Sequence, residues 1–315
     1  MLMFIARRLA TGAALILIVT AITFAMVFAN GTNIAVNILG ETATPEDIAA
    51  TTTQLGLDRP VFVQYFDWLG SALTGDLGTS YFTEESVWSA LAVRVPVTVS
   101  LVLFAMVLIL AASIVAGVVA ARRGGAIDSA VQSLSVIGFA LPSYWIALVL
   151  VLVVAIPLPA VFPPTGFVSI GDSVVGWLGT ATLPALALAI GGIGAVAQQI
   201  RGSMVDVLRL DYIRTLRSRG ISDRSIFYRH ALRNAAGPAL TVLSLQFIGM
   251  LGGVIIIERV FALPGIGILA STSALRGDVP VVMGTVAFTV VVVVVVNLLV
   301  DILQGVLNPK VRIDV

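Results

Sequence analysis

Residues 279–300 read VPVVMGTVAFTVVVVVVVNLLV, a stretch without charge that lies between Asp278 and Asp301. About 20 apolar residues are needed to cross the hydrocarbon core of a bilayer as a helix. The valine run at 290–296 is β-branched and would favour a strand in water, but a lone strand in lipid leaves its backbone polar groups unpaired. This stretch therefore predicts a membrane-spanning helix.

Five further apolar stretches precede it, each set off by charged residues. Their runs are continuous rather than alternating, which indicates helices rather than the strands of a membrane barrel. Pro142 predicts a kink in the third stretch, and the prolines at 157–164 predict a short loop after it. We therefore expect an all-α integral membrane fold with six transmembrane helices, the first five at about 9–29, 95–121, 129–155, 173–200 and 234–257.

The composition excludes several other classes of protein. The chain is 58% hydrophobic and only 11% charged, which excludes a water-soluble fold, and its net charge of +1 gives no general affinity for nucleic acid. It has no cysteine and one histidine, His230, which argues against thiolate or imidazole metal sites. The single lysine, Lys310, is followed by valine, so the chain has no Gly-x-x-x-x-Gly-Lys-Ser/Thr phosphate loop. We expect no catalytic, cofactor-binding or metal-binding residues.

Basic residues are distributed unevenly between the predicted loops. Fourteen of the eighteen fall on one side of the membrane, and the exceptions are Arg59, Arg94, Arg259 and Arg276. The positive-inside rule then places the N- and C-termini in the cytoplasm. Arg7 and Arg8 before the first stretch also fit a signal peptide, but its length and the lack of an Ala-x-Ala site favour a retained helix.

The predicted outer loop, residues 30–95, carries signals for structure of its own. Thr44 followed by Pro45 is typical of a helix start, and Gly56 of its end. A second apolar segment, Val61–Leu73, fits a cap packed over the helix ends, an interfacial helix at the lipid headgroups or a surface that reads substrate. Residues 75–80, GDLGTS, predict a turn in which Asp76 bonds nearby backbone N–H groups.

The longest predicted cytoplasmic loop follows Arg201. Apolar residues recur four apart from Met204 to Leu216 and predict one helix, with Asp211 and Arg214 able to pair on its surface. Gly220 is placed to end this helix and Ser222 to cap a short second one that runs from Asp223 to about Arg233. The basic pair of helices fits a lipid-binding strip, a DNA-binding helix-turn-helix or a docking element for a cytoplasmic partner. The membrane span on either side disfavours DNA.

Several motifs along the chain resemble the permeases of bacterial ABC importers, and more narrowly the dipeptide, oligopeptide and nickel branch. In the cytoplasmic loop they are DYIRT at 211–215, RGIS at 219–222 and RHALRNA at 229–235. Elsewhere they are LGLDRP at 55–60 with QY at 64–65, GDLGTS at 75–80, FALPGIG at 261–267 and the tail from Asp301 to Arg312.

The sequence departs from the general pattern of these permeases at three places. The Glu-Ala-Ala of the coupling motif falls on residues 214–216, and only its glycine, Gly220, is kept. The proline that follows later in the same motif is replaced here by Arg233, and a proline occurs at Pro238 instead. The Pro-Gly-Asp-Pro run after the first span is replaced by residues 30–33.

The resemblance implies a type I ABC importer permease of the bacterial inner membrane. Residues 1–95 would form the first helix and external subdomain, 96–305 a five-helix core with its coupling loop at 201–238, and 306–315 a cytoplasmic tail. It implies as partners a second, homologous permease, two cytoplasmic ATPases that bind ATP and Mg, and an external binding protein. The ATPase-coupling residues would be Asp211, Tyr212, Arg214, Gly220, Ser222, Arg224, Arg229, His230 and Arg233.

The function implied is ATP-driven import of di- to oligopeptides by alternating access. An independent observation agrees, because Glu258 and Asp301 lie only at span ends and the span interiors lack the ionisable groups of a proton-coupled carrier. Import of nickel, haem or another small solute is the alternative within the family. A membrane scaffold that uses its basic loop to bind lipid or protein is the alternative from another class.

Uncharged polar residues inside the spans are the candidates for the translocation path. Each of them also fits an interhelical hydrogen bond, and the small-residue pairs Gly249/Gly253 and Gly191/Ala195 are expected to mark contacts between helices. The candidates for the path are Ser143, Gln198, Gln246 and Asn297.

Overall fold

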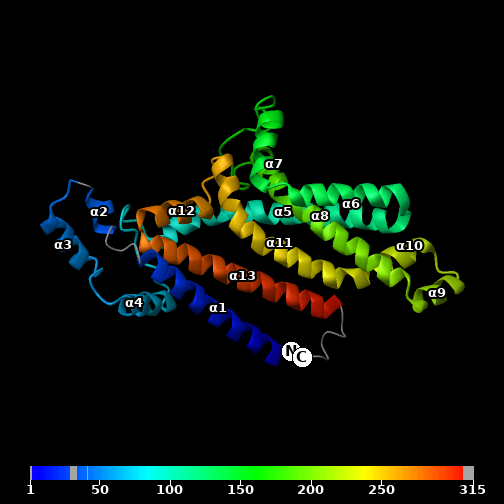
Figure 1. Ribbon diagram of the computed structural model, residues 1–315, viewed down its shortest axis with the longest axis horizontal. Helices are drawn as coiled ribbons and strands as arrows, with labels where there is room; N and C mark the ends of the chain where they lie inside the picture. Colours follow the sequence, from blue (N-terminus) through cyan, green and yellow to red (C-terminus); the bar gives the residue numbers. More distant parts are fainter. Residues whose placement is uncertain (1, 29–33, 41, 308–315) are drawn as a thin grey trace. The chain divides into compact units, whose positions relative to one another are not determined.

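The computed structural model describes residues 2–28, 34–40 and 42–307, and its regular structure is helical (Figure 1). Two short π-helical segments, η2 and η3, interrupt the α-helices. The elements are α1 Leu2–Phe28, α2 Ile34–Leu39, α3 Pro45–Gln54, α4 Val61–Leu73, α5 Val87–Arg123, α6 Gly125–Ala140, α7 Ser143–Leu150, η2 Val151–Ala155, α8 Val174–Leu208, α9 Asp211–Ser218, α10 Asp223–Ser225, η3 Ile226–Ala231, α11 Leu232–Val260, α12 Ile266–Arg276 and α13 Val279–Leu307.

The all-α membrane fold is confirmed. Among the described residues, five helices are long and apolar enough to cross a bilayer, and a bent pair supplies a sixth if its two arms form one span. All five extend beyond the apolar stretches that predicted them, because flanking polar residues continue the helical hydrogen bonding. The five are Ala6–Phe28, Val87–Arg123, Val174–Leu208, Asp223–Val260 and Val279–Gly305.

The third predicted span is not one helix. It breaks between Ala140 and Ser143, and its arms meet at 97°. Proline disfavours the helical conformation of the residue before it, and Leu141 is extended at φ −78° and ψ 126°. The kink expected at Pro142 is therefore a right-angle bend.

The chain divides into two compact units. The first comprises residues 99–263 and 296–307 of the described chain, and α8 is its central helix, with 67% of its apolar window buried. Helix α6 approaches it closely, since a Cβ at Gly194 of α8 would lie 2.5 Å from the Ser135 carbonyl oxygen of α6. Helices α7 and α11 also pack against α8.

The second unit comprises residues 2–98 and 264–295. The helix expected after Thr44 is confirmed as α3, because the Thr44 hydroxyl accepts a hydrogen bond from the Asp47 amide. The segment Val61–Leu73 is confirmed as a helix with those bounds. Thr98 Oγ1 accepts a hydrogen bond from the Ile266 amide, so the start of α12 is fixed to α5.

The GDLGTS turn is anchored at its end. Asp76 accepts a hydrogen bond from the Gly78 amide as expected, and Gly78 is left-handed at φ +88°. Buried Ser80 donates to buried Asp278 at 2.5 Å, and the Tyr81 amide donates to the same carboxylate at 3.1 Å. Burial raises the pKa of the Tyr81 phenol, and the Asp278 charge raises it further. The turn therefore fixes the segment that ends at Tyr81 to the start of α13.

Some expectations lie outside the described residues or stay predictions. Residues 30–33 and the tail 308–315, with Lys310 and Arg312, are outside the part of the chain that the structure describes. The functional division at residues 95 and 305 and the cytoplasmic location of both termini stay predictions.

We expect Gly194→Ala to destabilise the protein by about 1–3 kcal/mol, because the added methyl group overlaps the backbone of α6. The matched control is Gly202→Ala on the same helix, where a Cβ has no neighbour within 4 Å. Heating detergent-solubilised protein and following the loss of monodisperse material measures the difference. Equal melting temperatures for the two variants would contradict this account of the α6–α8 contact.

Candidate functional site

The predicted coupling segment, residues 201–238, begins within α8 and does not continue as one helix. Helix α8 ends at Leu208, and Leu210 is extended at φ −70° and ψ 146° before α9 starts at Asp211. The apolar stripe expected from Met204 to Leu216 is therefore split between two helices. The fully buried side chain of α9 is Ile213, which was expected to widen that stripe, whereas Tyr212 on the stripe itself is 39% exposed.

Gly220 ends α9 as expected. Its φ is +76°, the left-handed region that glycine enters without steric cost. The Ile221 amide donates to the Leu216 carbonyl and the Gly220 amide to the Arg217 carbonyl, which is the hydrogen-bond pattern of a Schellman motif. This turn reverses the chain between α9 and the next helix.

The second helix of the segment is longer than expected. Ser222 is its N-cap residue, but the Ser222 hydroxyl makes no capping hydrogen bond. From Asp223 the helix runs through α10, η3 and α11 to Val260, with no break between the Gly220 turn and the membrane span. Short π segments are frequent at functional sites, and η3 lies where the predicted docking residues Arg229 and His230 are found.

Two contacts tie α9 to this long helix. The Asn234 side-chain amide donates to the Tyr212 hydroxyl at 2.9 Å and to the His230 carbonyl at 2.9 Å. Arg217 lies 3.7 Å from Asp223 across the turn, in an exposed ion pair. The expected pair Asp211–Arg214 forms at 3.4 Å, but both side chains are highly exposed, so it contributes little.

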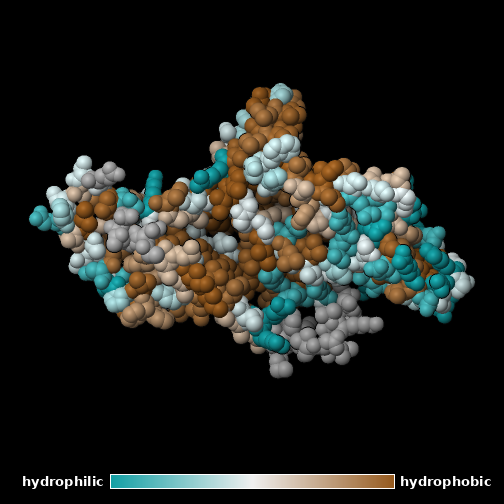
Figure 2. All heavy atoms as spheres, in the orientation of Figure 1, coloured by the Kyte–Doolittle hydropathy of each residue, from teal (hydrophilic) through white to brown (hydrophobic). Residues whose placement is uncertain are grey.

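The segment has a buried apolar underside and an exposed basic face. Ile226 is fully buried and Phe227 is nearly so, with the Arg122 guanidinium of α5 5.9 Å from the Phe227 ring centre. His230 is half-buried. In Figure 2 the surface over α9 and α10 is mainly hydrophilic. The exposed basic residues of the predicted set are Arg214, Arg224, Arg229 and Arg233.

A hollow of about 390 Å³ opens on this basic face. It is lined by Ser222, Arg224, Ser225 and Tyr228. Two of the four were expected from the sequence, whereas Ser225 and Tyr228 were not. Tyr228 is 49% exposed. The signal available in the sequence was an aromatic residue directly before Arg229 and His230.

The first unit also contains a cavity of about 250 Å³ between α7, α8 and α11. Ser143 and Gln246, two of the four path candidates, both line it. Gly249 and Gly253 line it as well, and a Cβ at either would meet nothing within 4 Å. Among the described residues, no other helix of this chain lies within 4 Å of either Cβ position, so the expected helix contact is not found within the chain and stays a prediction.

The remaining path candidates lie elsewhere. Gln198 lines a second hollow of about 350 Å³ with Gln199, Ser203 and Asp206. Asn297 is on α13 and lines neither space. Gly191 does mark a contact, since its Cβ position lies 3.5 Å from the Gly138 carbonyl oxygen on α6, whereas Ala195 lines the Gln198 hollow.

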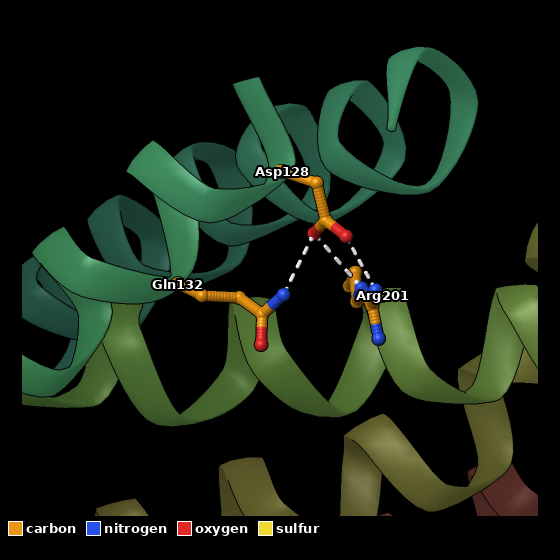
Figure 3. A network of polar contacts seen from close by, with 3 residues as sticks. All are labelled: Asp128, Gln132 and Arg201. Atoms are coloured by element: carbon orange, nitrogen blue, oxygen red, sulfur yellow. Dashed lines mark hydrogen bonds and ion pairs between the residues drawn. The ribbon is translucent and has the colours of Figure 1, made fainter. Parts of the chain in front are cut away.

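An ion pair that the sequence analysis missed joins α6 to α8 beside the start of the coupling segment (Figure 3). Arg201 binds both carboxylate oxygens of Asp128, with Nε donating to Oδ1 at 2.9 Å and Nη2 donating to Oδ2. Gln132 donates to the same Oδ1 at 3.1 Å. Bidentate arginine–carboxylate pairs fix orientation as well as distance, so this pair holds the two helices together at one end.

Comparisons with known proteins place the chain in a family. The family described as "Binding-protein-dependent transport system inner membrane component" matches residues 113–313, and the N-terminal part of such components matches residues 1–102.

Relatives match over nearly the whole length. A protein of Brucella abortus (strain 2308), provisionally named a peptide transport system permease, is 40% identical over 98% of this chain and 99% of its own. The di/tripeptide transport system permease protein of Pseudomonas aeruginosa is 35% identical, and the metal-staphylopine import system permease protein of Staphylococcus aureus is 33% identical, each over 99% of both chains. The chain therefore belongs to the family of binding-protein-dependent transport system inner membrane components, and it is a multi-pass permease subunit of an ABC importer.

Proposed function

We propose that this chain forms, together with a second homologous permease, the path by which di- to oligopeptides cross the inner membrane. An external binding protein delivers the peptide. Two cytoplasmic ATPases bind ATP and Mg and dock on the coupling segment, residues 201–238. This chain itself binds no cofactor, and its N- and C-termini lie in the cytoplasm.

One observation carries the proposal: a single helix joins the docking surface to the cavity. Arg224 near its start lines the basic hollow, and Gln246 further along lines the cavity. The 22 residue steps from Arg224 to Gln246 span about 33 Å at 1.5 Å per residue. A force on the basic face therefore reaches the cavity wall through continuous helix rather than through a loop.

The local contacts make the docking surface a stiff unit. The Schellman turn at Gly220, the Tyr212–Asn234 hydrogen bond and the buried Ile213 hold α9 against the long helix. When the ATPases close, α9 and the helix that starts at Asp223 then move together. Such a rigid-body tilt alternates access to the path.

The cavity supports a peptide as cargo. Gln246 offers an amide and Ser143 a hydroxyl, and the glycines beside them leave room without adding charge. Neutral donors and acceptors suit a peptide backbone, which must be released again. Relatives named for peptide transport favour the same cargo class, while the metal-staphylopine relative makes a chelated metal the alternative.

Reconstitution tests the proposal. The chain is assembled in proteoliposomes with its candidate partner permease and ATPases, and ATP hydrolysis and uptake of labelled di- to pentapeptides are measured with and without the binding protein. Stimulated hydrolysis with peptide accumulation is the expected result. Stimulated hydrolysis without peptide uptake would overturn the cargo, and failure to associate with any ATPase would overturn the coupling role and favour a membrane scaffold.

We expect Gly220→Val to abolish uptake while membrane insertion is kept. Valine is strained at φ +76°, whereas nothing within 4 Å obstructs its Cβ, so the effect is confined to the turn. Gly220→Asn is the matched control, because asparagine tolerates the left-handed region. Uptake and membrane content are measured for both. Full uptake by the valine variant would contradict the docking role of the turn.

We expect Gly249→Leu to reduce uptake several-fold without loss of ATPase binding. Its Cβ position is open, so the larger side chain fits without unfolding the helix and occupies the cavity instead. The control is Gly70→Leu on α4, which also has no neighbour within 4 Å and is not one of the residues that line the cavity. Equal uptake by the two variants, at equal membrane content, would show that cargo does not pass through this cavity.

A further inference from the structure

Helix α4, Val61–Leu73, presents three distinct faces. At about 100° per residue, Gln64, Tyr65 and Trp68 share one face, Phe62, Phe66 and Leu73 a second, and Asp67 and Ser71 a third. The first face is directed into the second unit: Gln64 is buried and Trp68 packs in the apolar core. The other two faces are exposed.

The inner face fixes α4 beside α1. The Tyr65 hydroxyl donates to the Leu17 carbonyl at 3.2 Å and lies 3.0 Å from the Thr20 hydroxyl. The Tyr65 ring also lies edge-on to the Phe24 ring, with 5.7 Å between the ring centres. The tyrosine therefore lies along α1 between Leu17 and Phe24.

This contact sets the depth of α4 in the membrane. The candidate span Ala6–Phe28 has 23 residues and is about 34 Å long, close to the roughly 30 Å of a bilayer core. Thr20 is eight residues from Phe28, or about 12 Å along the axis. A helix that reaches Thr20 and Leu17 through one tyrosine side chain lies where the acyl chains meet the headgroups, so one of its sides can face acyl chains and another water.

The second face of α4 is apolar and uncovered. Phe62, Phe66 and Leu73 are 66%, 63% and 81% exposed. At the same level α1 exposes apolar side chains of its own, Ile18 and Met26 among them. In Figure 2 brown surface occurs over both helices. The apolar surface of α4 thus continues the lipid-facing surface of a membrane span.

The third face is suited to water and headgroups. Asp67 pairs with Arg59 at 2.7 Å, and both side chains are about half exposed. An exposed apolar stripe beside an exposed polar one is typical of helices that lie in the plane of the interface.

We propose that α4 is a membrane-embedded amphipathic helix, with Phe62, Phe66 and Leu73 inserted among phospholipid acyl chains in the leaflet at the Phe28 end of α1. The occupant of the apolar face is lipid. The proposal depends on the insertion of α1 and not on the cargo or on ATPase coupling.

Spin-label accessibility tests the proposal, and the cysteine-free chain allows labels to be placed singly. Full-length protein, with the subunits that copurify, is reconstituted in nanodiscs of phosphatidylethanolamine and phosphatidylglycerol. Nitroxides are attached to Phe62→Cys and Phe66→Cys, with Met26→Cys as the membrane reference and Ser71→Cys on the same helix and Glu46→Cys on α3 as water-facing controls. Collisions with oxygen, which partitions into lipid, and with a water-soluble nickel chelate are measured by power saturation.

Labels at Phe62 and Phe66 are expected to match the reference, with more oxygen than nickel collisions, whereas those at Ser71 and Glu46 show the reverse. More nickel than oxygen collisions at Phe66 would overturn the proposal by placing this face in water. Low collision with both reagents would overturn it by showing that a protein, such as a second permease or a binding protein, covers the face.

Discussion

The structure depends on the need to pair every backbone N–H and C=O group that lies in hydrocarbon. This constraint keeps residues 290–296 helical despite their β-branching. It also limits the places where a helix can be interrupted. Pro96, Pro184 and Pro238 lie inside continuous helices, where each costs one hydrogen bond. Pro142 instead stands at a true break, and there the chain turns by 97°.

Local signals predicted local structure well. The Thr44 cap, the bounds of Val61–Leu73 and the left-handed turn at Gly220 each depend on a few neighbouring residues, and all three are found. The stripe from Met204 to Leu216 failed because spacing alone does not reveal whether a helix continues. The chain leaves the helix at Leu210, and burial of Ile213 holds α9 on a new axis.

Pairings between distant residues could not be predicted in this way. Asp128 and Arg201 are 73 positions apart, and Ser80 and Asp278 are 198 apart. Each of these residues resembles an ordinary loop or helix-end polar group until the fold brings its partner near. The open space beside Gly249 has the same origin, because a small-residue spacing favours close packing only where a second helix is present.

The three faces of α4 and the continuity of the Asp223–Val260 helix have the same physical basis. A helix satisfies its own backbone, so its side chains alone decide whether protein, lipid or water lies against each face. On α4 this places three environments around one helix. On the long helix it places a basic surface at one end and a neutral cavity wall further along. Because the residues that line the cavity carry no charge, a polar solute inside it would meet hydrogen-bonding groups but no ion-pair partner that would hold it tightly.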